Sequence, residues 1–336
     1  MSIDLSDRLS IEYPVVQAGM GGGVSGSELA SAVCSAGGLG TIGITSAERL
    51  EQEIVRTREC VGGRPFAVNL LMPVVRPAHV AICVRQKVPV VTFFYGFHAG
   101  YARALQEAGC LVSWQVGSVE EAEKVVEAGA DFLIVQGHEA GGHIRGTRRL
   151  ADLLPRVRAR FSELPLVASG GIWGRESAER AMQLGADGVA AGTRFLLTEE
   201  SRAHEAYKQR LLEADRTVAT TLFGVGWLAP HRVVPNAAVE RWAPGGDPPS
   251  WVNALNRLSQ ATAKLLPLGR EELAIRLQRV SRPFYSPVCL LEGMDEKLVH
   301  VTPLYAGEAV SEMTRLCPVD VAVREMAAGC VASVET

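Results

Sequence analysis

Short apolar runs alternate with amphipathic helical patterns between about residues 10 and 200 of the chain. A recurring junction separates them, in which a helical pattern ends in Ala-Gly and an apolar run follows, as at Ala108-Gly109 and Ala128-Gly129. Glycine just past a helix end adopts the left-handed conformation that costs other residues energy. A continuous apolar run after such a turn is typical of a strand buried on both faces, as in a parallel sheet.

The pattern predicts eight strands, with helical patterns in most of the gaps between them. These strands are expected at residues 13–18, 39–44, 66–71, 90–94, 111–115, 132–136, 166–169 and 188–191. Alternating strand and helix units of this length predict an α/β fold with a parallel sheet. Eight such units favour a closed TIM (β/α)8 barrel over the alternative, a doubly wound open sheet.

The pattern changes after residue 198, where the predicted barrel ends. A charged helix is expected at 199–214, a stretch rich in Pro, Gly and Trp follows, and helical pattern resumes at 251–280. We interpret residues 199–300 as an inserted or appended helical lid over the barrel mouth. Residues 301–336 would return to the barrel through a helix expected at 309–328.

Composition and charge narrow the class of protein. Hydrophobic residues make up 47% of the 336 positions and aromatic residues only 6%, so the core is built mainly from aliphatic side chains. The net charge of -3 and the lack of a basic stripe argue against nucleic-acid binding. The seven cysteines include no Cys-x-x-Cys pair, which disfavours a disulfide framework or a zinc site. A polar N-terminus and the absence of a run of ~20 apolar residues predict a cytoplasmic protein without a membrane span.

Two glycine-rich loops follow the seventh and eighth predicted strands. They read Ser169-Gly170-Gly171 and Gly192-Thr193, and neither contains an acidic residue. The active site of a TIM barrel lies at the carboxyl ends of its strands, and this pair of loops often binds a phosphate through backbone N–H groups. The two loops together predict a phosphate site, with close packing of strand and helix as the alternative.

The loop after the sixth strand is the most distinctive segment of the chain. It runs from Gln136 to Gly146 and contains His138, Glu139 and His143 among four glycines. The two histidines have metal-ligand residue types, but the glycines disfavour the helix that would bring both rings to one face. We therefore expect no metal, and one histidine that transfers a proton near neutral pH.

Four strings of residues carry a resemblance to a known family, and they occur in the family's order. The chain resembles the nitronate monooxygenases, formerly called 2-nitropropane dioxygenases. The string Glu139-Ala140-Gly141-Gly142-His143 is also shared with the flavin-dependent enoyl-acyl-carrier-protein reductases, so it indicates the superfamily rather than one reaction. The strings lie at 14–20, 136–143, 168–172 and 188–195, with a weaker match at 303–308.

The resemblance implies a TIM barrel that binds FMN non-covalently and needs no metal. It assigns His143 as the active-site base or substrate-orienting group. It also implies the oxidation of alkyl nitronates, as small-molecule substrates, with O2 to a carbonyl compound and nitrite. The sequence does not fix the oligomeric state, and a homodimer is compatible with it. The cofactor-binding residues would be Ala18, Gly19 and Met20, Asn69, Gln115 and Gln136 at the flavin ring, and Gly141, Gly142, Ser169, Gly170, Gly171, Gly192 and Thr193 at the phosphate end.

The chain departs from the family pattern at several positions. Gly19 stands where the family usually has Pro, and Glu308 stands where it often has a Gln that would contact the flavin. Ile144 separates His143 from an Arg-Gly pair, and the loop at 93–98 is unusually aromatic. This loop and the tryptophans of the second region would either shape a substrate pocket or form the core of the lid.

Three other functions compete with nitronate oxidation. The first is reduction of an enoyl thioester by NAD(P)H on the same flavin barrel. The second is a non-redox barrel, such as a lyase or isomerase, that binds a phosphate ligand. The third is a binding or scaffold protein, which the histidine-bearing glycine loop disfavours.

Overall fold

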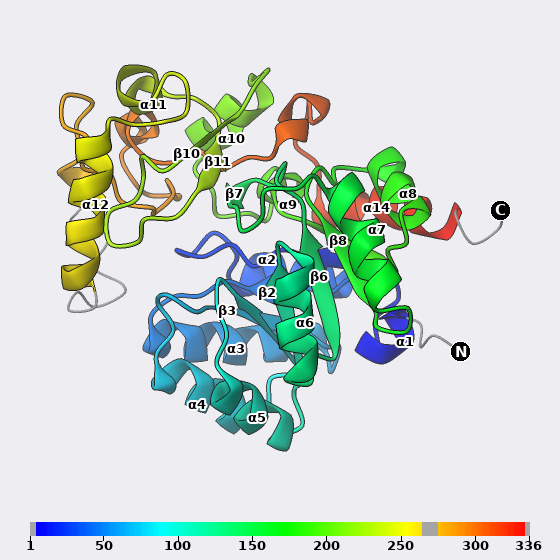
Figure 1. The fold of residues 1–336 in the computed structure, drawn as a ribbon. Coiled ribbons are helices and arrows are strands. Elements are labelled where there is room, and N and C mark those ends of the chain that lie inside the picture. The colour runs from blue at the N-terminus through cyan, green and yellow to red at the C-terminus, as the bar shows by residue number, and fades with distance from the viewer. Residues whose placement is uncertain (1–4, 264–274, 333–336) are drawn as a thin grey trace.

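The computed structural model describes residues 5–263 and 275–332 and shows eight parallel strands arranged as a barrel (Figure 1). The strand order is β1-β9-β8-β6-β5-β4-β3-β2. A parallel bridge between Val16 and Leu39, next to β2, closes the ring at β1. This arrangement confirms the predicted TIM barrel and excludes the open sheet. The strands are β1 (Val15–Gln17), β2 (Thr41–Ile42), β3 (Ala67–Leu71), β4 (Val90–Phe94), β5 (Leu111–Val116), β6 (Phe132–Gln136), β8 (Leu166–Ser169) and β9 (Gly188–Ala191).

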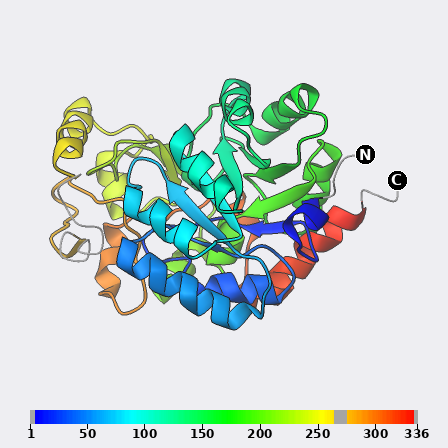
Figure 2. The ribbon, with the colours of Figure 1, turned by 90° about the horizontal axis from the view of Figure 1, so that it is seen from below.

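Helices surround the strands, and the last barrel helix comes from the C-terminus. The helix α14 packs against both α8 and α2, so it fills the place of the eighth barrel helix although the whole second region precedes it in the chain. Figure 2 shows α14, in red, beside the first, blue part of the chain. The barrel helices are α2 (Ser27–Ser35), α3 (Ala47–Val61), α4 (Pro77–Arg85), α5 (Ala99–Glu107), α6 (Val119–Glu127), α7 (Leu150–Arg160), α8 (Arg175–Gln183) and α14 (Val319–Ala332).

The interior of the barrel is filled by small and medium apolar side chains, including Val16, Ala67 and Ala190. The short helix α1 (Leu5–Leu9) belongs to the same cluster and adds two fully buried leucines to it. A Cβ on Gly188 would lie 2.5 Å from Leu5 Cδ2, so this glycine allows α1 to pack closely on β9. The interior is therefore a packed core, which leaves the carboxyl ends of the strands for function.

Residues after β9 form a second hydrophobic core, and this region contains strands that the prediction of a helical lid did not include. Two three-residue strands, β10 (Val218–Thr220) and β11 (His231–Val233), pair antiparallel and are joined by β7 (Gly142–His143) from the loop after β6. The predicted lid is therefore not purely helical, because strands this short leave no periodic signal among Pro, Gly and Trp residues. The region also contains α9 (Thr193–Leu196), α10 (Glu205–Leu212), α11 (Ala237–Trp242), α12 (Ser250–Ala263), η1 (Glu296–His300) and η2 (Glu308–Glu312).

The predicted helix at 309–328 is two elements, η2 and α14. Pro318 immediately precedes α14, where its missing N–H costs nothing, but it would break a helix that ran through it. The predicted helix at 199–214 is shorter and lies in α10. Of the helical pattern at 251–280, α12 accounts for the first part, and residues 264–274 lie outside the described residues.

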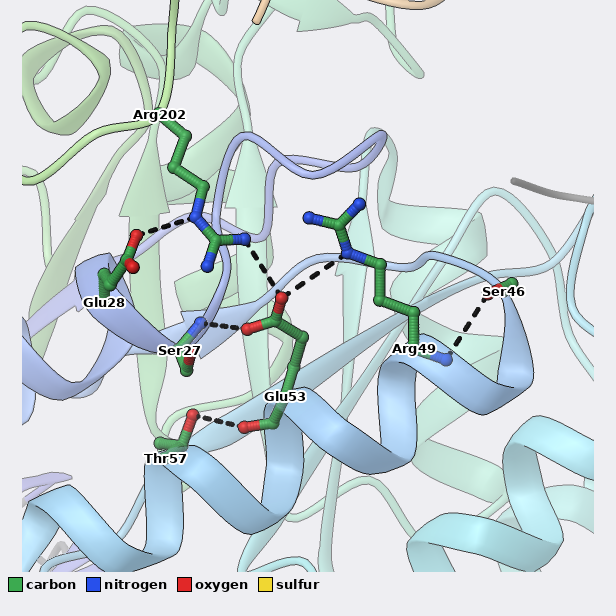
Figure 3. A network of polar contacts seen from close by, with 7 residues as sticks. All are labelled: Ser27, Glu28, Ser46, Arg49, Glu53, Thr57 and Arg202. Carbon is green, nitrogen blue, oxygen red and sulfur yellow. Dashed lines mark hydrogen bonds and ion pairs between the residues drawn. The ribbon is translucent and has the colours of Figure 1, made fainter. Parts of the chain in front are cut away.

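A buried carboxylate connects the second region to two barrel helices (Figure 3). Glu53 on α3 accepts a hydrogen bond of 2.6 Å from the backbone N–H of Ser27, at the start of α2, and pairs with Arg202 at 3.0 Å. Arg202 also pairs with Glu28, and Arg49 lies 3.5 Å from Glu53. Burial by itself raises the pKa of Glu53, but the Ser27 N–H and the Arg202 guanidinium outweigh it and lower the pKa to about 2. Glu53 therefore stays ionised, and its ion pair with Arg202 links the barrel helices to the second region.

Within the described residues, no helix combines the length and apolar character that crossing a lipid bilayer requires.

Candidate functional site

His143 lies where the barrel meets the second region. It is the last residue of β7 and pairs with His231 on β11. The loop that carries it is held from the barrel side by Gln136, whose Nε2 donates to His143 O at 2.9 Å and whose Oε1 accepts from Arg145 N at 3.0 Å. Both ends of the Gln136 amide thus hold this loop, and the cofactor contact that the family resemblance implies for Gln136 stays a prediction.

Aromatic rings surround the His143 imidazole. The indole of Trp227 stacks on it, with ring centroids 3.9 Å apart and planes inclined by 18°. Tyr95 approaches edge-on, with centroids 6.2 Å apart, and Tyr305 lies 5.6 Å away. We call Tyr95, Trp227, His231 and Tyr305 the aromatic cluster. Its members come from the loop after β4, from β11 and from two other segments of the second region, which explains why no local sequence pattern revealed it.

The environment keeps His143 neutral. Burial and the neighbouring His231 lower the pKa of His143 well below its ordinary value of 6.5. The Nε2 atom is buried and has no hydrogen-bond partner among the described residues. An unpaired buried polar atom is costly, and in native proteins it often marks the position of a ligand. This nitrogen is therefore a candidate to accept a proton from a bound substrate.

His231 is also neutral, but both of its ring nitrogens have partners. Burial lowers its pKa to about 4. Its Nδ1 lies 2.9 Å from Ala229 O, and the Phe223 N–H donates to its Nε2 at 3.4 Å. These partners assign the proton to Nδ1 and leave no donor for a substrate. His231 thus fixes the segment that carries Trp227.

The aromatic loop at 93–98 contacts the His143 ring through Tyr95. Its backbone has a φ of 65°, an uncommon conformation for a non-glycine residue. The hydroxyl donates to Ile144 O at 2.8 Å, and burial raises the Tyr95 pKa to about 12. Ile144, which departs from the family pattern, therefore provides a carbonyl that anchors the ring beside His143.

The glycine loops after β8 and β9 form an open cradle. Gly170 and Gly171 have φ values of 109° and 69°, which side-chain-bearing residues rarely adopt. A Cβ on Gly171 would come no closer than 3.6 Å to Glu139, and a Cβ on Gly192 would approach only Ala18, at 3.8 Å. Backbone at these positions is thus accessible to a ligand group such as a phosphate.

Two other predicted glycines serve close packing instead. A Cβ on Gly141 would lie 2.5 Å from Gly307 N, so this glycine lets two loops of the chain touch. A Cβ on Gly19 would lie 2.3 Å from Asn69 Cβ. Proline, which the family usually has at position 19, carries a Cβ, so the position of Asn69 explains the departure.

Most of the remaining predicted site residues lie at or just after the carboxyl ends of barrel strands, whereas Asn69 is the middle residue of β3 and Gly142 lies in β7. Ala18 N–H donates to Ala191 O, and the backbone of Met20 is held by the Ser25 hydroxyl. Thr193 Oγ1 accepts from Gly307 N–H at 3.0 Å. Asn69 and Ser169 are buried, Gln115 is half-buried, and Gly142 has open space where a Cβ would be.

Two arginines that the sequence did not single out lie near the cradle, together with Glu139 and Glu308. Arg149 and Arg232 both pair with Glu308, at 2.9 and 3.0 Å. Glu139 accepts from Leu150 N–H at 3.0 Å and so caps α7. Glu139, Arg149 and Glu308 line a cavity of about 540 Å³ together with Gly170 and Gly171.

A TIM barrel with a glycine cradle at its last two strands and a histidine at its mouth belongs to a class of cofactor-dependent barrel enzymes. Comparison with known families specifies the class. The family described as nitronate monooxygenase matches residues 3–81 and 74–326. The chain belongs to the nitronate monooxygenase family, whose members are flavin-dependent, and it is an oxidoreductase.

Several individual proteins are similar to this chain. The (3aS,4S,5R,7aS)-5-hydroxy-7a-methyl-1-oxo-octahydro-1H-indene-4-carboxyl-CoA dehydrogenase of Mycobacterium tuberculosis is 36% identical over 272 residues, which are 77% of this chain and 75% of the relative. The structure of FabK from Thermotoga maritima superposes with a TM-score of 0.78 at 30% identity, over 98% of this chain and 96% of that one. Nitroalkane oxidase from Streptomyces ansochromogenes gives a TM-score of 0.77 at 29% identity, over 99% of both chains.

Proposed function

We propose that this protein is an FMN-dependent oxidoreductase that oxidises alkyl nitronates with O2 to a carbonyl compound and nitrite. The observation that carries the proposal is the neutral His143, whose buried Nε2 has no partner among the described residues. Membership of the nitronate monooxygenase family and similarity to a nitroalkane oxidase support the reaction class.

The residues present fit a flavin mononucleotide. Gly171 and Gly192 offer backbone at positions with space for a phosphate. Ala18 and Met20 follow β1 at the same end of the barrel, where a flat ring system would rest on backbone and small side chains. Bound FMN would supply the electron-accepting chemistry, which no side chain of the protein provides.

The protein's own contribution is the handling of a proton. A neutral imidazole accepts a proton at its unprotonated ring nitrogen, and the depressed pKa keeps His143 in this neutral form at neutral pH. A nitroalkane has an acidic carbon next to its nitro group, and His143 would remove that proton to form the nitronate. When the substrate is already a nitronate anion, His143 orients it rather than acting as a base. The aromatic cluster excludes water from the imidazole and holds its ring plane.

A second candidate reaction is redox chemistry on an acyl thioester. The relative at 36% identity is a carboxyl-CoA dehydrogenase by name. The carbon next to a thioester carbonyl is also an acid that a buried neutral base can deprotonate. Enoyl-thioester reduction by NAD(P)H belongs to the same group of reactions.

Anaerobic stopped-flow spectroscopy of the purified flavin-loaded enzyme separates these candidates. A nitroalkane, its nitronate, an acyl-CoA, NADH and NADPH are mixed in turn with the enzyme, and bleaching of the flavin band is followed. We expect rapid bleaching by the nitro compounds, and nitrite release once O2 is admitted. Rapid bleaching by NADH or by the acyl-CoA alone would replace nitronate oxidation with thioester chemistry. A colourless protein that takes up no FMN would indicate a non-redox barrel.

A further inference from the structure

Glu308 is shared between two arginines that come from different parts of the chain. Arg149 lies just before α7, and Arg232 lies on β11. Their guanidinium groups approach opposite oxygens of the Glu308 carboxylate, Oε2 at 2.9 Å and Oε1 at 3.0 Å. Arg149 is largely exposed, whereas only 5% of the Arg232 side chain is exposed.

This arrangement lies directly behind the glycine cradle. Gly307, the residue before Glu308, donates its N–H to Thr193 Oγ1 at 3.0 Å and packs against Gly141. The cavity that contains Glu308 and Arg149 is also lined by Gly170 and Gly171. The carboxylate therefore lies beside the loops to which we assign the cofactor phosphate.

The buried arginine has an unused donor. Arg232 donates through one terminal nitrogen to His138 O at 3.1 Å and pairs with Glu308. Its Nε is buried and has no partner among the described residues. Burial lowers the pKa of Arg232, whereas the Glu308 and Glu139 carboxylates act in the opposite direction. A second anion would improve the environment of this guanidinium.

We propose that Arg149 and Arg232 form the charged part of the phosphate site, and that Glu308 is an internal anion that competes with the flavin phosphate for them. The inference rests on the proposed function, because it requires FMN to bind at the cradle. The ligand is a phosphate monoester, and the Glu308 carboxylate lowers the affinity of the site for it.

Charge arithmetic gives the direction of the effect. Glu139 and Glu308 balance Arg149 and Arg232, so a phosphate dianion arrives at a site with no net positive charge from these residues. Removing the Glu308 charge leaves one positive charge in excess. In a cavity open to water, where the dielectric approaches that of the solvent, a unit charge a few ångströms from a phosphate changes the affinity by about five- to tenfold.

The test compares FMN with riboflavin, which has the same ring system and no phosphate. Dissociation constants are measured by quenching of flavin fluorescence in wild type, Glu308→Gln, Arg149→Gln and Glu312→Gln. Glu312 is the matched control, since it is exposed, lines the same cavity and makes no ion pair among the described residues. Arg149 is preferred to Arg232 because it is exposed and its replacement leaves the core intact.

We expect Glu308→Gln to tighten FMN binding by about five- to tenfold and Arg149→Gln to weaken it by several-fold. Riboflavin binding should change less than about twofold in every variant. Glu312→Gln should change FMN binding clearly less than Glu308→Gln does, because the exposed Glu312 carboxylate is screened by solvent and makes no ion pair with an arginine among the described residues. An unchanged ratio of riboflavin to FMN dissociation constants in Glu308→Gln would overturn the inference while leaving the proposed function intact. A wild-type protein that binds neither flavin would instead remove the proposed function.

Discussion

The two halves of the site are built in opposite ways. The glycine cradle consists of barrel backbone, and its members follow consecutive strands β8 and β9. The aromatic cluster around His143 consists of side chains, most of which come from the second region. In the proposed function, the barrel therefore holds the cofactor, whereas the second region provides most of the surroundings of His143.

The strand β7 is where the two halves meet. Gln136 ties its loop to the barrel, and pairing of His143 with His231 ties it to β11. His143, the proposed base, therefore belongs to the three-stranded sheet of the second region, although the chain reaches it directly from the loop after β6. A substitution in the glycine cradle should change FMN binding, and one in the aromatic cluster should change the reactivity or the pKa of His143. Four substitutions test the two halves and the contact between the two regions.

The largest expected effect is on the cradle. Gly171→Asp should abolish FMN binding, since a carboxylate next to a phosphate is strongly repelled at short range. Gly171→Asn is the matched control, because it imposes the same backbone strain at a φ of 69° without the charge. Flavin absorbance after desalting gives the readout. Retention of the yellow colour in the Asp variant would show that the phosphate lies elsewhere.

The next effect is on the base. His143→Ala should keep FMN bound but slow the flavin reduction by a nitroalkane by roughly 10²–10⁴-fold, the usual contribution of a general base. The exposed His300 in η1 provides the control, and His300→Ala should react as the wild type does. Wild-type rates in the His143 variant would withdraw its catalytic assignment.

A third substitution tests how firmly the two regions are joined. Glu53→Gln should lower the free energy of unfolding at pH 7 by about 3 kcal/mol, because the carboxylate stabilises the fold through its lowered pKa. The folded pKa of about 2 lies below the ordinary value of 4.5, so this stabilisation is complete above pH 4.5 and is lost as the pH falls toward 2.

Urea unfolding of the variant and the wild type at several pH values measures this difference. The gap between them should shrink on acidification. Glu51→Gln, at a partly exposed pair with Arg85, should leave stability near the wild-type value. A gap that is constant between pH 7 and pH 3 would show that the Glu53 charge is not the cause.

The smallest effect should come from the stacked indole. Trp227→Ala exposes the His143 ring to water, so its depressed pKa should rise toward 6.5. Because the base must be neutral, the acidic limb of the rate profile should move to higher pH in step with it. NMR titration of the histidine ring carbons follows the pKa directly, and Trp251→Ala, at a half-exposed position on α12, is the control. An unchanged pKa of His143 would show that residues other than Trp227 bury the ring and lower its pKa.

The sequence predicted the barrel well and the lid poorly, for physical reasons. Buried parallel strands produce apolar runs bounded by glycine turns, so all eight strands were placed near their observed positions. The strands β10 and β11 are too short to show a period, and their partner β7 lies far away in the chain.

In the site too, features with a local sequence pattern were predicted, and features that depend on long-range contacts were not. The glycine loops were recognised as a phosphate site from their positions after strands, and this assignment stays a prediction. The stacking of Trp227 on His143 and the sharing of Glu308 by two arginines depend on long-range contacts that carry no local signal. The different roles of Gly141 and Gly171 became visible only from the space around each residue.

An experimental structure of the FMN-loaded enzyme tests the central claim most directly. Our account predicts that the phosphate contacts the loops at Gly170-Gly171 and Gly192-Thr193, with the ring system between Ala18 and His143 and the imidazole facing it. A flavin bound away from these loops, or a His143 ring turned out of the barrel mouth, would contradict the account.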